Sequence, residues 1–217
     1  MTVHTNMHVQ LPTRAFAFLD GLQMLSGAGL VLFMWSHLIM VSSVLLGPGV
    51  MDALAHFLEE SYLVHSGGPF VGIMFLLHFA LASRKVPFHL EQQESIWNQA
   101  RMIRHTDTWL WLVQAFTAMI ILIMGSIHMW VVLSDLPITA AKSAARVQSW
   151  NWLTFYLILL PMVEFHVGIG FYRIGVKWGF VKSNKRKGFK KFENILTLMF
   201  ITIGLLTLLR FWLLSPE

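Results

Sequence analysis

The stretch PMVEFHVGIG (residues 161–170) contains a glutamate and a histidine two positions apart within a long apolar segment. The uncharged residues on both sides of Glu164 predict a membrane-spanning helix at about residues 150–176. An ionisable side chain at the centre of a bilayer costs about 2.5–3.5 kcal/mol, so it needs a partner or a task. Both Glu164 and His166 are therefore expected to serve a function inside the membrane.

The whole chain has the composition of an integral membrane protein. Of its 217 residues, 56% are hydrophobic and only 12% are charged, whereas about 25% are charged in a typical globular protein. A helix needs about 20 apolar residues to cross the hydrocarbon core. One domain over residues 1–217 is expected, with five spans at about residues 22–46, 66–84, 108–134, 150–176 and 194–214.

The basic residues predict how the chain is oriented. Of the 16 Lys and Arg residues, only Lys142, Arg146 and Arg210 fall on one side of the predicted membrane. Because cytoplasmic loops carry the excess of Lys and Arg, the N-terminus is predicted to be cytoplasmic and the C-terminus to lie outside. The first twenty residues lack the pattern of a cleavable signal peptide, so the first helix is expected to be retained.

Four of the ten histidines lie within the spans, one on each of the first four helices: His37, His78, His128 and His166. A rise of about 1.5 Å per residue places His37 and His128 toward the outer face and His78 and His166 toward the inner face. A zinc or copper site would need its ligands at one depth. Two facing imidazoles are the axial ligands of a six-coordinate haem b, an electron carrier.

These histidine pairs predict two haem b groups. The expected fold is an all-α membrane protein with five transmembrane helices, the first four of which form a haem-binding bundle. The chain has no cysteine, which excludes disulfides, thiolate-bound iron–sulfur clusters and thioether-attached haem within it. The alternatives are structural histidines and a transporter or channel that relays protons without haem; the visible spectrum of the purified chain distinguishes them.

Four short segments resemble a known family: WSHLIMVS (residues 35–42), HFALASRKVPFH (78–89), GSIHMW (125–130) and EFHVGIGFYRIGVKWG (164–179). Within five predicted helices, they are similar to the cytochrome b subunit of di-haem quinol:fumarate reductases and succinate:menaquinone oxidoreductases of anaerobic bacteria. The resemblance covers essentially the whole chain. It implies that His78 and His166 bind the proximal haem, on the cytoplasmic side, and that His37 and His128 bind the distal haem.

The resemblance implies a function within a larger complex of the bacterial inner membrane, with a periplasmic C-terminus. The subunit would oxidise menaquinol to menaquinone near the outer haem and pass electrons through both haems toward fumarate, or carry out the reverse. FAD and iron–sulfur clusters would reside on a flavoprotein and an iron–sulfur subunit, because this chain has neither a cysteine cluster nor a glycine-rich dinucleotide motif.

Other features of the assembly stay open at this point. A dimer of the heterotrimer is one assembly available to such a complex, and no nucleic-acid partner is expected. The basic run KSNKRKGFKKF (residues 182–192) suits a docking face for the partner subunits or an anchor on anionic membrane lipid. The alternative function is a di-haem cytochrome b subunit of another quinone-linked complex, such as hydrogenase or formate dehydrogenase.

Three carboxyl groups are candidates for proton transfer. In the family, a glutamate in the connection near the distal haem is needed for menaquinol oxidation, which implies Glu59 or Glu60 in the acidic outer loop at residues 51–68, with Glu59 preferred. A glutamate two residues before a haem ligand is proposed to carry protons across the membrane, which implies Glu164. A protonated Glu164 that is hydrogen-bonded to a helix carbonyl is the structural alternative.

Haem propionates are anions that need cations or hydrogen-bond donors at the helix ends. Lys177, at the inner end of the fourth span, suits the proximal haem, and Arg146, at its outer start, suits the distal haem. Gln23 and Trp111, near the inner ends of the first and third spans, are further donors. Each of these residues also suits the alternative role of an anchor at the membrane interface.

Overall fold

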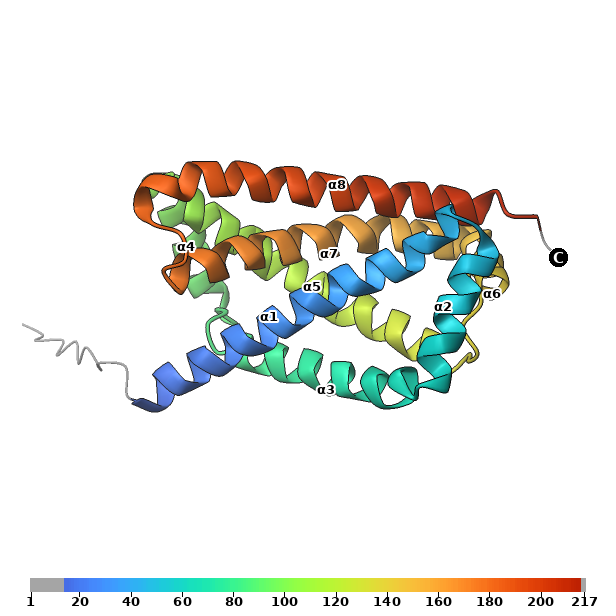
Figure 1. Ribbon diagram of the computed structural model, residues 1–217. Helices are drawn as coiled ribbons and strands as arrows, with labels where there is room; N and C mark the ends of the chain where they lie inside the picture. Colours follow the sequence, from blue (N-terminus) through green and yellow to red (C-terminus); the bar gives the residue numbers. More distant parts are fainter. Residues whose placement is uncertain (1–13, 216–217) are drawn as a thin grey trace, which may run out of the picture.

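The computed structural model describes residues 14–215, and all regular secondary structure in this range is helical (Figure 1). Five long helices contain the apolar segments: α1 (Arg14–Ser42), α3 (Leu63–Ser83), α5 (Thr106–Leu133), α7 (Trp150–Lys177) and α8 (Arg186–Trp212). Each is long and apolar enough to cross a membrane, which confirms the predicted number of helices that could span it.

Three shorter helices connect the spans: α2 (Pro48–Glu60), α4 (Leu90–Ile103) and α6 (Ala140–Val147). Gly47 turns the chain into α2 with a φ of 139°, a conformation that glycine reaches readily. The prediction of a loop at residues 51–68 is therefore wrong, because nearly all of this segment belongs to α2 and α3. Its Ala, Leu, Met and Glu residues favour helix, but an amphipathic helix gives no transmembrane signal.

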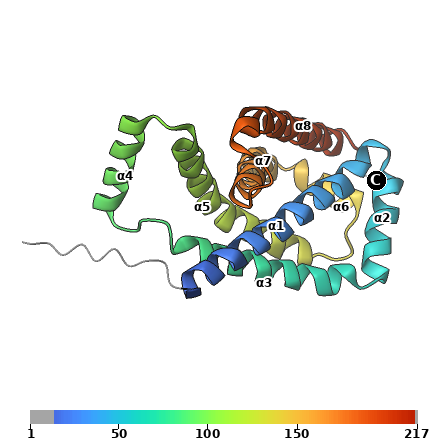
Figure 2. The ribbon, with the colours of Figure 1, turned by 60° about the vertical axis from the view of Figure 1, so that its left-hand side comes forward.

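The spanning helices form one bundle with α4 at one end and with α2 and α6 at the other (Figure 1). These ends are called the α4 end and the α6 end below. Helix α3 packs mainly against α1, α5 packs mainly against α7, and α8 also packs on α7. Figure 2 shows α4 standing apart from the bundle. The candidate site thus lies among α1, α3, α5 and α7, while α8 adds a further layer.

Two glycines allow α7 and α8 to approach closely. A Cβ atom added to Gly204 would lie 2.5 Å from Leu160 Cδ1. A Cβ atom on Gly168 would lie 2.6 Å from Glu193 Oε1 and would collide with the Thr197 hydroxyl. Small residues commonly let membrane helices pack closely. At Gly168, however, the space is filled by polar side chains of α8.

The start of α8 differs from the prediction. The fifth span was expected from residue 194, whereas α8 begins at Arg186 and includes most of the basic run at residues 182–192. Lys and Arg are good helix formers, so the helix continues beyond the apolar segment toward the α4 end. As a result, Glu193 lies inside a long helix that packs on α7.

Candidate functional site

His37 of α1 and His128 of α5 lie next to each other toward the α6 end. Their ring centres are 6.0 Å apart, and their ring planes are inclined by 66°. Two imidazole nitrogens that each lie about 2 Å from a shared metal ion put the ring centres roughly 6 Å apart. The observed separation therefore fits the predicted pair of axial ligands.

Aromatic side chains hold both rings of this pair. The Tyr156 hydroxyl of α7 lies 3.3 Å from His128 Nδ1, and the two rings meet edge to face. Phe33 stacks on His37 from one turn earlier on α1, with ring centres 5.7 Å apart. Because Nδ1 of His128 already has a partner, its Nε2 is the nitrogen left for a metal.

His78 of α3 and His166 of α7 are the second predicted pair, and both lie toward the α4 end. His78 contacts α1 and His166 contacts α5, so each ring is fixed by a neighbouring helix. His78 Nδ1 lies 3.1 Å from the Gln23 carbonyl oxygen, and His166 Nδ1 lies 3.1 Å from the Gln114 carbonyl oxygen. A carbonyl can only accept a hydrogen bond, so Nδ1 carries the hydrogen in both rings. Each Nε2 therefore presents a lone pair, as a metal ligand requires.

Two of the four histidines lie toward each end of the bundle. Within residues 14–215, no group of three or more His, Cys, Asp or Glu side chains gathers closely enough to hold a metal ion. A zinc or copper site would need such a group. The arrangement instead suits a group that takes one ligand from each of two facing helices.

The Gln23 side chain adds a second observation at the α4 end. Its Oε1 atom is buried and has no hydrogen-bond partner among the residues that the structure describes. An amide group can be turned so that its NH2 occupies the same position. The Gln23 amide can therefore donate a hydrogen bond to an anion such as a haem propionate.

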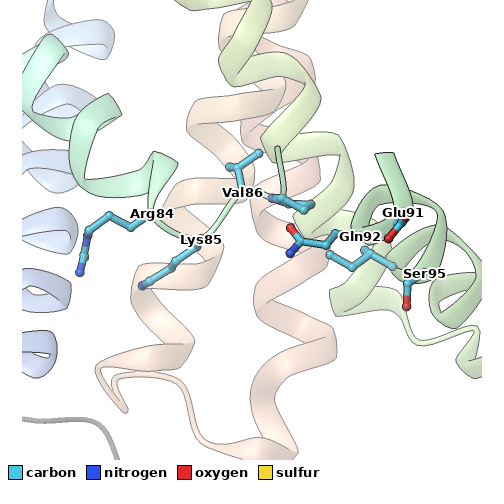
Figure 3. Close-up of a pocket in the computed structure, with 8 residues that line it drawn as sticks. Arg84, Lys85, Val86, Glu91, Gln92 and Ser95 are labelled. Atoms are coloured by element: carbon cyan, nitrogen blue, oxygen red, sulfur yellow. The ribbon is translucent and has the colours of Figure 1, made fainter. Parts of the chain in front are cut away.

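Asp20 of α1 forms ion pairs with three basic side chains at the α4 end. Its carboxylate lies 2.8 Å from Lys85, 3.3 Å from Arg84 and 3.5 Å from Lys177. Figure 3 shows that Arg84 and Lys85 project from the end of α3 on the side away from α4. Lys177 is thus paired with Asp20, and an anion at this position would share Lys177 with that carboxylate.

Trp111 lies beside α4. It lines a groove of about 520 Å³ between α4 and α5, together with Trp97 and Phe116. A neighbouring groove of about 460 Å³, shown in Figure 3, lies between the end of α3 and α4. Trp111 therefore faces the open space next to α4, and its role as a propionate donor stays a prediction.

Arg146 lies at the α6 end. Its guanidinium donates a hydrogen bond of 2.8 Å to Asp135, which also accepts one of 3.0 Å from Lys142. The hydrogen bond from Lys142 lowers the pKa of Asp135, so this carboxylate stays ionised. Arg146 thus lies at the same end of the bundle as His37 and His128. This position agrees with the expected location of Arg146 at the outer pair.

The structure places Glu59 and Glu60 differently. Glu59 Oε1 accepts a hydrogen bond of 2.6 Å from the backbone N–H of Ile138, in the connection between α5 and α6. Glu60 is exposed and lies 3.4 Å from His56 one turn earlier on α2. Glu59 therefore faces the bundle at the α6 end, and Glu60 faces away from it.

Glu164 is only 2% exposed. Gly168, one turn further along α7, leaves the space that the Thr197 and Glu193 side chains of α8 fill. Thr197 Oγ1 donates a hydrogen bond of 3.2 Å to Glu193, which also forms an ion pair with Lys190. A series of polar side chains thus runs from the turn after Glu164 toward the α4 end.

Sequence reasoning missed several of these residues. Glu193 fell just outside the predicted fifth span, although Glu193 and Thr197 are four residues apart and so share one face of a helix. The residues of α1 and α5 that contact His78 and His166 lie in two similar tetrapeptides, QMLS (residues 23–26) and QAFT (residues 114–117). This repeated spacing is the signal that could have identified them.

The five spanning helices and the two histidine pairs define a multi-pass, all-helical membrane protein. Residues 91–206 match the family model of the succinate dehydrogenase/fumarate reductase transmembrane subunit. The chain is similar to the fumarate reductase cytochrome b subunit of Helicobacter pylori, with 35% identity over 201 residues, which cover 88% of this chain and 79% of that protein. It is also similar to the subunit of the same name from Wolinella succinogenes, with 34% identity over 210 residues, which cover 90% of this chain and 81% of that protein.

The chain therefore belongs to the succinate dehydrogenase/fumarate reductase transmembrane subunit family, among the fumarate reductase cytochrome b subunits. This confirms the resemblance found from the four histidine-containing segments.

Proposed function

We propose that this chain is the membrane anchor and electron-transfer subunit of a quinol:fumarate reductase. It would oxidise menaquinol near the haem that His37 and His128 would hold, and the electrons would pass to the haem that His78 and His166 would hold. FAD- and iron–sulfur-containing partner subunits then reduce fumarate to succinate, and the same parts serve the reverse reaction. The observation that supports this function best is the position of two histidines toward each end of one bundle, with the ring centres of His37 and His128 6.0 Å apart.

Haem b, when bound, supplies a one-electron carrier at each pair. His78 and His166 would hold the proximal group through Nε2, and His37 and His128 would hold the distal group. At the α4 end, Gln23, Trp111 and Lys177 are the candidate partners of the proximal propionates. Arg146 is the candidate at the α6 end. The orphaned amide of Gln23 is the strongest support for this arrangement.

We infer that the α4 end faces the cytoplasm, because this end carries most of the basic residues. The relatives are named as subunits of fumarate reductase, so other subunits complete the enzyme. The start of α8 and the turn at Arg84 and Lys85 present a basic surface at this end. The partner subunits would dock there, where the proximal haem is nearest to their iron–sulfur clusters.

Purification of the native complex through a tag on this chain tests the proposed function. The expected preparation shows the reduced spectrum of haem b, contains a flavoprotein and an iron–sulfur subunit, and reduces fumarate with a menaquinol analogue as donor. A preparation that contains hydrogenase or formate dehydrogenase subunits instead would overturn the assignment to this complex. A colourless preparation would overturn the haem function itself.

Menaquinol oxidation releases two electrons and two protons, so the quinol site needs a base near the haem that would take up the electrons. Glu59 has the suitable position, because its carboxylate lies at the α6 end beside the backbone of Ile138. A carboxylate held by one N–H group keeps further lone pairs for a proton. We therefore prefer Glu59 to Glu60 as the base.

Glu59→Gln is expected to slow menaquinol oxidation by about 10²-fold or more, which is the usual contribution of a general base. Both haems and fumarate reduction by an artificial donor are expected to remain, because glutamine can still accept the hydrogen bond from Ile138. Assays of the purified complex with a menaquinol analogue and with reduced viologen measure the two activities.

Asp52→Asn is the matched control for Glu59→Gln. Asp52 accepts a hydrogen bond of 2.6 Å from the Ala140 N–H, so it holds the same connection in the same way. We expect this variant to keep menaquinol activity. Glu60→Gln tests the neighbouring glutamate. Full menaquinol activity in Glu59→Gln, in Glu60→Gln and in the double variant would exclude both glutamates from the quinol site.

We also propose that Glu164 carries protons across the membrane in step with electron transfer. Quinol oxidation at the outer face and fumarate reduction in the cytoplasm would otherwise separate charge across the membrane. Glu164 is buried within the bundle. Burying a carboxyl group in the membrane costs free energy, so such a group is expected to have a partner or a function. The polar side chains of Thr197, Glu193 and Lys190 extend from its neighbouring turn toward the α4 end.

A further inference from the structure

Each histidine of the α4-end pair is contacted by a hydroxyl group from a different helix. Ser26 Oγ of α1 lies 3.1 Å from His78 Nδ1. Thr117 Oγ1 of α5 lies 3.2 Å from His166 Nδ1. Both hydroxyl residues are buried, with exposures of 8% for Ser26 and 2% for Thr117. Water therefore does not compete freely for these contacts.

The hydrogens of the two hydroxyl groups are already used. Ser26 donates to the Gln23 carbonyl at 3.1 Å. Thr117 donates to the Val113 carbonyl at 2.8 Å, and the Gln114 carbonyl lies 3.1 Å away. A hydroxyl group has one hydrogen, so each oxygen can only accept from the neighbouring imidazole. This leaves Nδ1–H as the donor in both rings.

Each Nδ1–H is consequently shared between two acceptors on one helix. The first is a backbone carbonyl, of Gln23 or Gln114, and the second is a hydroxyl three residues later. Two acceptors prevent the ring from rotating and exclude the tautomer that has its hydrogen on Nε2. The same arrangement occurs on α1 and on α5, at the tetrapeptides QMLS and QAFT.

The α6-end pair is held in another way. His128 Nδ1 meets the phenol of Tyr156, and the His37 ring is stacked on Phe33. Among the contacts within residues 14–215, neither His37 nor His128 has a ring N–H that is shared between a backbone carbonyl and a hydroxyl of one helix. The two sites therefore differ in the hydrogen bonds of their ligands.

We propose that Ser26 and Thr117 are positioning residues that set the reduction potential of the α4-end haem and leave that of the α6-end haem unchanged. The inference rests on the proposed haem function. An acceptor beside Nδ1–H makes the imidazole a more basic ligand, and a more basic ligand stabilises ferric iron. The two hydroxyl groups thus lower the potential of one haem through His78 and His166.

Thr117→Val tests this inference, because valine keeps the branched shape of the side chain but removes the acceptor. We expect the midpoint potential of one haem to shift upward while the other haem keeps its potential and the haem content stays the same. The electron paramagnetic resonance signal of the same haem is expected to change. Thr117→Ser should restore the original potential, since serine returns the hydroxyl group.

Ser26→Ala is the second variant, and it removes the acceptor beside His78 with a smaller change in packing. Thr202→Val is the matched control: Thr202 lies exposed on α8, and its hydroxyl donates only to its own helix, to Leu198 at 2.8 Å. The titrations use the purified complex in detergent and follow the haem absorption. They therefore do not depend on turnover.

The haem that shifts is identified with His37→Ala, which lacks the α6-end haem. An upward shift that survives in the His37→Ala background supports the inference. Unchanged potentials and resonance signals in the Ser26→Ala/Thr117→Val double variant would overturn it, and so would a shift confined to the α6-end haem. A chain without haem would overturn the proposed function itself, which distinguishes the two failures.

Discussion

Replacing His78 or His166 by alanine is expected to remove one haem, and replacing His37 or His128 is expected to remove the other. A six-coordinate haem b needs both axial imidazoles, so each variant should retain about half of the haem of the unchanged protein. The grouping follows from the structure, because His37 and His128 lie 6.0 Å apart between ring centres at the α6 end. The other two histidines lie toward the α4 end.

Haem content and a redox titration of each purified variant measure this effect. Each variant should lose one of two redox transitions, and both members of a pair should lose the same one. His56→Ala is the control, because its side chain is 70% exposed on α2 and should leave both haems in place. If His37→Ala and His78→Ala abolished the same transition, the assignment of the pairs would be wrong.

Glu164→Gln is expected to retain both haems and electron transfer from artificial donors, while menaquinol-driven fumarate reduction slows by about 10²-fold or more. Glutamine keeps the size of the side chain and its hydrogen-bonding capacity, but it cannot take up or release a proton. If Glu164 carries protons with the electrons, its loss leaves the charge movement uncompensated. The menaquinol reaction would then build up a membrane potential, and this potential would oppose further electron transfer.

The complex in sealed vesicles provides the measurement for Glu164. The menaquinol reaction is followed together with a dye that reports membrane potential, and the haem potentials are expected to lose part of their pH dependence. Glu91→Gln, on the exposed surface of α4, is the matched control. A variant at Glu164 that turned over menaquinol at the unchanged rate, with no potential developing, would identify this residue as a structural carboxyl.

The sequence by itself determined the five spans and the order of the histidines along them. Apolar length is a local property, and the fixed rise of a helix converts residue number into depth. His37 and His128 could therefore be grouped before any contact was known. The connecting helix α2 was missed for the same reason, because an amphipathic segment such as residues 51–60 has no transmembrane signal.

Only the tertiary structure decided which side chains surround the histidines. It brought Ser26 and Thr117 to His78 and His166, turned Glu59 toward Ile138 while Glu60 faces outward, and placed Glu193 beside Gly168. Residue number gives the height of a side chain along its helix, but the rotation of the helix and the identity of its neighbours depend on packing. Those contacts arise between helices that are distant in the chain, so no local pattern specifies them.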